Sequence, residues 1–163
     1  MASFVFNVAR GRLRQYYDSI DSNLVIATGP IQSTANSALI VVLLEATALE
    51  ADATLADYDD LSTLIAGASN EQTTMGRKTL TDSDIVASGQ DDTNNRLDLD
   101  IPDQTWLATA GNAVGKMLVC YDPDTTAGTD TTVIPLTAHD LTMTPDGTDF
   151  TAQIPAAGFY RSA

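Results

Sequence analysis

The chain of 163 residues has one cysteine and one histidine. With Cys120 alone, no disulfide can form within the chain, and a zinc site built from several cysteines is excluded. With His139 alone, a cluster of histidines around a metal ion is excluded as well. The length is sufficient for a hydrophobic core that folds without cross-links. We therefore expect an ordinary globular domain with no cofactor and no structural metal.

Long apolar runs are also absent. The longest, from Ala38 to Leu49, is interrupted by Glu45, and a membrane-spanning helix needs about 20 apolar residues. In the first fifteen residues, MASFVFNVARGRLRQ, the arginines follow the apolar stretch, whereas a secretory signal has its basic residues first. We therefore expect neither a membrane anchor nor a signal segment.

Motifs of nucleophilic catalysis are missing too. The sequence has no G-x-S-x-G, and MGRKT lacks the upstream glycine and the spacing of a phosphate-binding loop. Cys120 lies in an apolar stretch, where a thiol usually packs as a small hydrophobic group. His139-Asp140 is a pair that can orient an imidazole, but no nucleophile motif accompanies it, so a surface turn is the favoured interpretation. The sequence predicts that the protein is not an enzyme.

Basic residues are few and unevenly placed. The chain has 22 acidic and 8 basic residues, with a net charge of −14. The first seventeen residues contain Arg10, Arg12 and Arg14 and no acid, so this segment carries +3 and the remainder −17. An acidic body repels nucleic acid, so direct nucleic-acid binding is not expected. Guanidinium groups bind carboxylates well at interfaces, so either the three arginines contact an acidic neighbouring subunit or they lie in solvent.

The N-terminal 36 residues are predicted to form an arm and a connecting segment. Phe4, Phe6 and Val8 alternate with other residues, a pattern typical of an extended segment. The following GRLRQYYDSIDS is consistent with a short helix that has Leu13, Tyr16, Tyr17 and Ile20 on one face, and Gly29-Pro30 indicates a loop. We predict that the protein-interaction residues are those of the arm: Phe4, Phe6, Val8, Arg10, Arg12 and Arg14.

Residues 37–163 are predicted to form a single β-rich domain. The run ALIVVLLEA, Ala38 to Ala46, is rich in β-branched residues and favours a buried strand over a helix. After it, apolar residues recur every three or four positions and predict one amphipathic helix at about residues 54–67. Strands are also predicted by the alternation at 97–101 and by the apolar run Met117–Tyr121. The Asp146-Gly147 pair lies between two alternating segments and predicts a hairpin.

The predicted fold is therefore mainly β. Short strands separated by frequent turns are typical of an antiparallel β-sandwich or barrel, here with one helix and an extended N-terminal arm. Asp122, Asp124 and Asp130 resemble the oxygen ligands of a calcium loop, but their spacing does not match the EF-hand pattern. Ordinary turns use the same residues, and the sequence leaves open whether this loop binds a cation.

Several segments resemble, in order along almost the whole chain, a family of small virion proteins of tailed bacteriophages that infect actinobacteria. The most distinctive are LEADATLADYDDL and LVCYDPDTTAGTD; others are RKTLT, DDTNNRLDLDIPDQTW, IPLTAHDLTMTPDGTDFTAQI and AAGFYRSA. Members of the family are labelled head decoration, minor capsid or minor tail proteins. The resemblance implies a structural protein of the virion and transfers no site residues.

Three hypotheses follow. The first is a capsid decoration (minor capsid) protein, made in the host cytoplasm, that binds the outer surface of the phage head and stabilises the shell. Its partners would be the major capsid protein and copies of itself, with a trimer suspected. The second is a minor tail or head–tail junction protein. The third is a secreted domain that binds carbohydrate or calcium, which the scarcity of aromatic residues, with Trp106 alone as tryptophan, disfavours.

Overall fold

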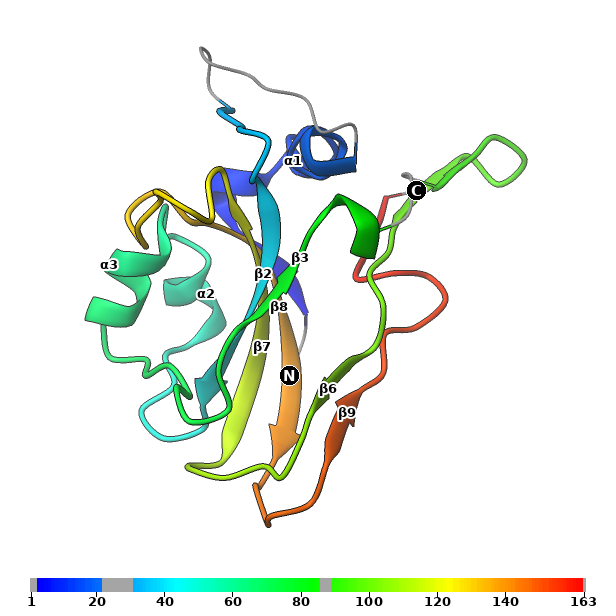
Figure 1. Cartoon of the computed structure of the whole chain (residues 1–163). Helices are drawn as coiled ribbons and strands as arrows, with labels where there is room; N and C mark the ends of the chain where they lie inside the picture. Colours follow the sequence, from blue (N-terminus) through cyan, green and yellow to red (C-terminus); the bar gives the residue numbers. More distant parts are fainter. Residues whose placement is uncertain (1–2, 22–30, 86–88, 163) are drawn as a thin grey trace.

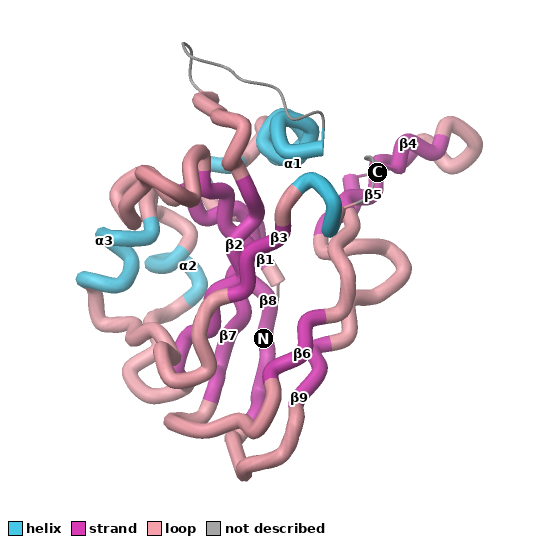
Figure 2. The backbone as a smooth tube through the Cα atoms, in the orientation of Figure 1, coloured by secondary structure: helices cyan, strands magenta, loops and turns pink. Residues whose placement is uncertain are grey.

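The computed structural model describes residues 3–21, 31–85 and 89–162 (Figure 1). Its main feature is a five-stranded antiparallel sheet in the order β1-β8-β7-β2-β3. These strands are β1 (Phe4–Val5), β2 (Ala38–Glu45), β3 (Lys78–Leu80), β7 (Val114–Asp122) and β8 (Ile134–Met143). Strands outnumber helices throughout the described chain (Figure 2), so the prediction of a mainly β, antiparallel fold is confirmed.

The two central strands explain the most apolar parts of the sequence. Every residue of β7 is buried, and β2 is buried from Ala38 to Leu44. A strand that is covered on both faces has no solvent side, so its sequence shows a continuous apolar run instead of alternation. Helices α2 and α3 lie on one side of the sheet, and β6 and β9 lie on the other (Figure 1). The prediction that ALIVVLLEA is a buried strand is confirmed.

The predicted helix at 54–67 is wrong in its extent. Two short helices stand there, α2 (Asp52–Leu55) and α3 (Leu61–Ala66). Asp60 separates them because it adopts an extended conformation and its Oδ1 accepts a 2.8 Å hydrogen bond from the backbone N–H of Thr63. An aspartate in this role begins a new helix. The apolar spacing of Leu55, Leu61 and Leu64 still marks the buried face.

The N-terminal segment, which was predicted to be an extended arm, packs on the strands of the same chain. Strand β1 pairs with β8, the 3-10 helix η1 (Asn7–Ala9) follows, and α1 (Leu13–Asp21) lies beyond it. The described residues of this segment share one core with the strands of 37–163. The reason is its own amphipathic pattern, which buries one set of apolar side chains completely: Phe6, Ala9, Leu13, Tyr16, Tyr17 and Ile20. The predicted loop at Gly29-Pro30 lies outside the described residues.

Two smaller sheets complete the fold. One contains β6 (Gln104–Trp106) and β9 (Phe150–Ala152), and the other has the order β10-β5-β4, with β4 (Gly89–Asp91), β5 (Arg96–Leu99) and β10 (Tyr160–Ser162). The 3-10 helix η2 (Asp82–Asp84) follows β3. The predicted hairpin around Asp146-Gly147 is wrong, because β8 and β9 pair with different strands although the chain turns there with Gly147 at φ +89°. Within the described ranges, no helix is long and apolar enough to cross a membrane.

Candidate functional site

The apolar residues of the predicted interaction site serve the protein's own core. Phe6 has no exposed surface, and its backbone N–H donates a 3.0 Å hydrogen bond to the carbonyl of Leu136. Phe4 lies against it with ring centroids 5.2 Å apart. Phe4 and Val8 are half-buried and pack on the same cluster. The prediction that Phe6 contacts another protein is therefore wrong, since the folded domain already covers it.

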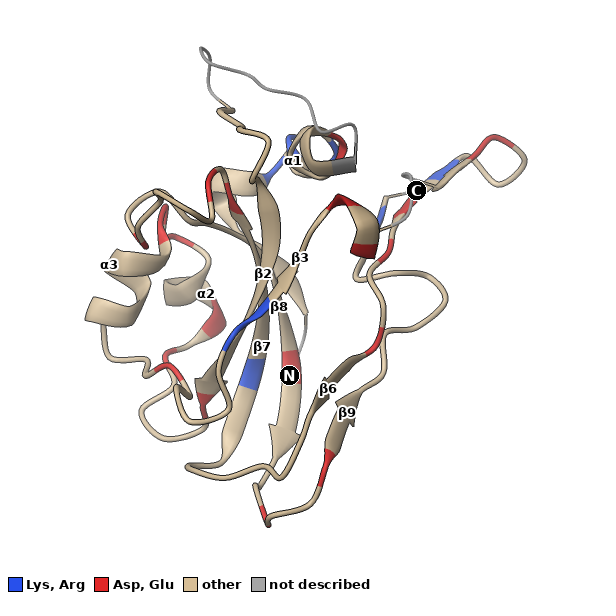
Figure 3. Cartoon of the chain, in the orientation of Figure 1, with Lys and Arg blue, Asp and Glu red and all other residues tan. Residues whose placement is uncertain are grey.

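The three arginines, by contrast, are exposed. Gly11 adopts a φ of +76° between η1 and α1, and α1 then turns its apolar face into the core. Arg10, Arg12 and Arg14 occupy positions between the buried ones and point outward; we call them the arginine surface. Arg14 forms an ion pair of 3.0 Å with Asp18 one helical turn away, yet its side chain is still 52% exposed. In Figure 3 basic and acidic residues both appear at α1, acidic residues are scattered in short patches over the rest of the chain, and a few further basic residues lie among them.

Other cations of the chain are held by acids of the same fold. The Arg77 guanidinium donates two hydrogen bonds to Glu71 and two to Asp130, all between 2.6 and 2.8 Å. These bonds hold the pKa of Asp130 below its usual range. Arg96 and Arg161 both pair with Asp98. Arg77 and Arg161 thereby join segments that are far apart in the sequence, whereas Arg10 and Arg12 are exposed, with Arg12 also hydrogen-bonded to Tyr16.

Lys116 forms the second notable site, which the sequence analysis missed. It lies on β7 with no exposed surface, and its Nζ is 2.9 Å from an oxygen of Asp52 and 2.5 Å from one of Asp140. The ring of Phe4 lies 5.5 Å from the same Nζ. Burial disfavours the ammonium, but the hydrogen bonds it donates to the two carboxylates outweigh this and raise the pKa of Lys116. One signal was available, a lysine inside the apolar stretch GKMLVCY.

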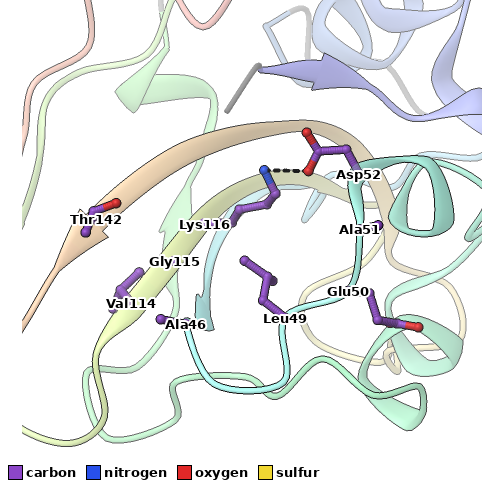
Figure 4. Close-up of a pocket in the computed structure, with 9 residues that line it drawn as sticks. All are labelled: Ala46, Leu49, Glu50, Ala51, Asp52, Val114, Gly115, Lys116 and Thr142. Carbon is purple, nitrogen blue, oxygen red and sulfur yellow. Dashed lines mark ion pairs between the residues drawn. The ribbon is translucent and has the colours of Figure 1, made fainter.

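A hollow of about 640 Å³ adjoins Lys116 (Figure 4). Its floor is the start of β7, and the segment that follows β2 forms one wall, so that Asp52 and Lys116 point toward each other. Gly115 permits this arrangement, because a Cβ there would lie 2.9 Å from Cδ2 of Leu49 and 3.0 Å from Cα of Ala46. The close approach of Leu49 to the strand brings Asp52 within reach of the buried ammonium.

The acidic loop between β7 and β8 is organised by protein donors. Oδ1 of Asp124 accepts hydrogen bonds from the backbone and hydroxyl of Thr126, and Oδ1 of Asp122 accepts one from the backbone of Asp124. Asp130 is engaged by Arg77. In residues 3–21, 31–85 and 89–162, no group of three or more His, Cys, Asp or Glu residues has the arrangement of a metal site. These contacts account for the loop as a set of turns.

His139 lies within β8 and Cys120 within β7, and they form no catalytic pair in the described structure. The prediction of a surface turn at His139-Asp140 is wrong, because both residues belong to a strand that pairs with β7. Nε2 of His139 is 2.9 Å from the hydroxyl of Thr137, and burial together with the charge of Lys116 lowers its pKa. Cys120 is fully buried in β7, and burial raises the pKa of its thiol far above the usual range. A buried thiol of this kind behaves as a small apolar group.

No protein-family model matches the chain, and no curated protein or solved structure does either. The arginine surface and the Lys116 cluster are therefore interpreted from their own chemistry.

Proposed function

We propose that this protein is a capsid decoration protein of a tailed bacteriophage, which binds the outer surface of the head and stabilises the shell. The proposal rests on the resemblance described above and on one structural observation. That observation is the arginine surface: Arg10, Arg12 and Arg14 are exposed on a chain whose other described arginines are paired with its own acids.

The arginine surface would contact carboxylates of the major capsid protein. A guanidinium presents a planar fork of donors that matches a carboxylate, and such pairs give orientation as well as attraction. Arg10 and Arg12 lie in the turn between η1 and α1, and Arg14 lies on α1. The turn is flanked by the buried residues Ala9 and Leu13, so the surface is held in one geometry before binding. Preorganisation of this kind reduces the entropic cost of association.

Stabilisation of the head follows from where the protein binds. A ligand that binds only the assembled shell shifts the equilibrium toward that shell. On a repeating lattice, contacts with the capsid and with other copies of this chain act together, so modest single contacts are sufficient. We propose that the other copies complete a symmetric oligomer, with a trimer as the first candidate.

The first test is the copy number in purified virions, measured by quantitative mass spectrometry against the major capsid protein. We expect a ratio near one or a simple fraction of one. A copy number of a dozen or fewer per particle would contradict a place on the head lattice and would favour the tail or the head–tail junction. Absence from particles would overturn both assignments.

The second test is binding to heads that lack the protein. The wild-type chain should co-sediment with them, and the triple variant Arg10→Glu, Arg12→Glu, Arg14→Glu should not. The matched control is Arg161→Glu, which also reverses an exposed charge but on β10. Equal binding by the triple variant would show that the arginine surface is not the contact.

A further inference from the structure

Lys116 combines two properties that are rarely found together. It is a fully buried amine, and it is in contact with two carboxylates on elements far apart in the sequence. Burying a charge is costly unless partners compensate it, so a buried lysine beside aspartates indicates either a structural ion pair or a reactive group. Desolvation alone favours the neutral, nucleophilic form of a buried lysine, but the two carboxylates here favour the ammonium, so Lys116 must pass a proton to an acceptor before it can react.

The strands fix the amine and one carboxylate opposite each other. Lys116 and Asp140 are direct partners in the antiparallel pairing of β7 and β8, and Nζ lies 2.5 Å from the carboxylate oxygen. Asp52 reaches the same Nζ from α2 at 2.9 Å, and the Phe4 ring lies 5.5 Å away. From this geometry we propose that Nζ of Lys116 and the side-chain carbonyl carbon of Asp140 become joined by an intramolecular amide bond, with Asp52 as the acid–base group.

The reaction balances without any further reactant. The ammonium of Lys116 gives a proton to the carboxylate of Asp52, and the neutral Nζ attacks the side-chain carbonyl carbon of Asp140. The new N–C bond forms, one C–O bond of Asp140 breaks, and the departing oxygen takes up the proton held by Asp52 and a second proton from the nitrogen. An ammonium and a carboxylate are thereby converted into one neutral amide and one water molecule.

The surroundings of Lys116 favour both the approach of Nζ to the Asp140 carboxyl group and the amide that results. The two groups are held together by the sheet, and fixed proximity can replace a very large effective concentration of reactant. The amide removes two charges from a site where the lysine has no contact with solvent, so the cost of burying them disappears. Asp140 is the acyl group because its side chain is 19% exposed and sits on the rigid strand, whereas the side chain of Asp52 is 39% exposed and sits on a short helix.

The decisive measurement is the intact mass of the full-length purified protein after overnight incubation at neutral pH. We expect a mass lower than that of the linear chain by one water molecule. Trypsin should then fail to cleave after Lys116, and residues 97–161 should appear as one product that also lacks one water. Fragmentation spectra should place the link between Lys116 and Asp140. A full mass in the folded wild-type protein would overturn the proposal.

Two variants separate the amide from other losses of water. Asp146-Gly147 is a sequence that forms a cyclic imide with the same mass change, but that change would persist in Lys116→Arg, whereas the amide would not. Asp52→Asn keeps the shape of the side chain and removes its proton-accepting oxygen, so it should leave most of the chain at full mass. A link mapped to Asp52, or a mass loss that survives in Lys116→Arg, would also overturn the proposal.

This inference does not depend on the function proposed above. The mass is measured on the isolated protein, whereas the place in the virion is measured by copy number and by binding to heads. Either result can therefore fail while the other stands.

Discussion

The buried cation Lys116 and the exposed cations of the arginine surface show how differently one protein can use the same charge. Lys116 is surrounded by Asp52, Asp140 and Phe4 and has no exposed surface. Arg14 is 52% exposed, and Arg10 and Arg12 are exposed beside it. A buried charge has fixed partners, and removing one of them destabilises the fold because the other is left buried without compensation. An exposed charge contributes little to stability and remains available to another protein.

The apolar residues of the same N-terminal segment follow a similar division. Phe6 is completely buried, whereas the arginines a few residues later are at the surface. The segment therefore has one face that completes the core and another that is free for recognition. A substitution on the core face should lower the stability of the fold, and a substitution on the arginine surface should weaken binding to the partner.

The largest expected effect is that of Phe6→Ala. Removing a fully buried phenylalanine leaves a cavity and should lower the free energy of unfolding by about 3–5 kcal/mol. Urea-induced unfolding followed by tryptophan fluorescence measures this change. The matched control is Val8→Ala. Because the side chain of Val8 is only half-buried, this substitution should lower the free energy of unfolding by clearly less. If Phe6→Ala were as stable as the wild type, the N-terminal segment would be separable from the core.

Lys116→Met tests the buried charge itself. Methionine fills much of the same space but leaves the carboxylates of Asp52 and Asp140 without their cation. Relative to wild-type protein in which the amide has not formed, this should destabilise the fold by about 3 kcal/mol. Lys78→Met is the control, because that lysine lies 5.4 Å from the Trp106 ring and such a contact is worth about 0.5–1 kcal/mol. Equal effects in urea unfolding would contradict the distinction between a buried and a surface lysine.

Arg77→Met tests an intermediate case, a half-buried cation. At pH 7 the loss of its hydrogen bonds to Glu71 and Asp130 should cost about 2 kcal/mol. Because Arg77 lowers the pKa of Asp130 in the folded state, the unfolded chain binds the proton more readily. This stabilisation is present above the unfolded carboxyl pKa of about 3.9 and is lost as the pH falls through the depressed folded pKa. The difference in the free energy of unfolding between wild type and variant should therefore become smaller when urea unfolding is repeated in acid.

The smallest effect on stability is expected from replacing Arg10, Arg12 and Arg14 together by alanine. Only Arg14 forms an ion pair within its own helix among the contacts described for the arginine surface, and such a pair is worth about 0.3–0.5 kcal/mol. The free energy of unfolding should therefore change by less than about 1 kcal/mol. Head binding should be lost in the same variant, and a large loss of stability would show that these arginines serve the fold instead.

Several elements could be predicted because their signal is local. The β-branched run at Ala38–Leu44 and the apolar run at Met117–Tyr121 became the central strands, since continuous burial requires continuous apolar residues. The pattern of Leu13, Tyr16, Tyr17 and Ile20 became the buried face of α1. The exposure of Arg10, Arg12 and Arg14 also followed from their charge.

Other features depended on contacts between distant residues. Nothing near Phe4 or Phe6 in the sequence specifies that β1 pairs with β8, so a packed edge strand was interpreted as an arm. Asp60 was expected to lie within a helix because the apolar spacing continues past it, yet its capping hydrogen bond begins a new one. Asp146-Gly147 indicated a turn, but which strands it joins was decided by β6, which lies about 40 residues earlier.

The sequence by itself determined the class of the fold, the placement of its central strands and the excess of basic charge at one end, because composition and short-range periodicity carry that information. Only the tertiary structure decided that the N-terminal segment belongs to the core and that Lys116, Asp52 and Asp140 meet. The physical reason is that pairing of strands and of charges joins residues separated by many positions. Lys116 and Asp52 are brought together by the path of the chain past Gly115, and no local pattern encodes that path.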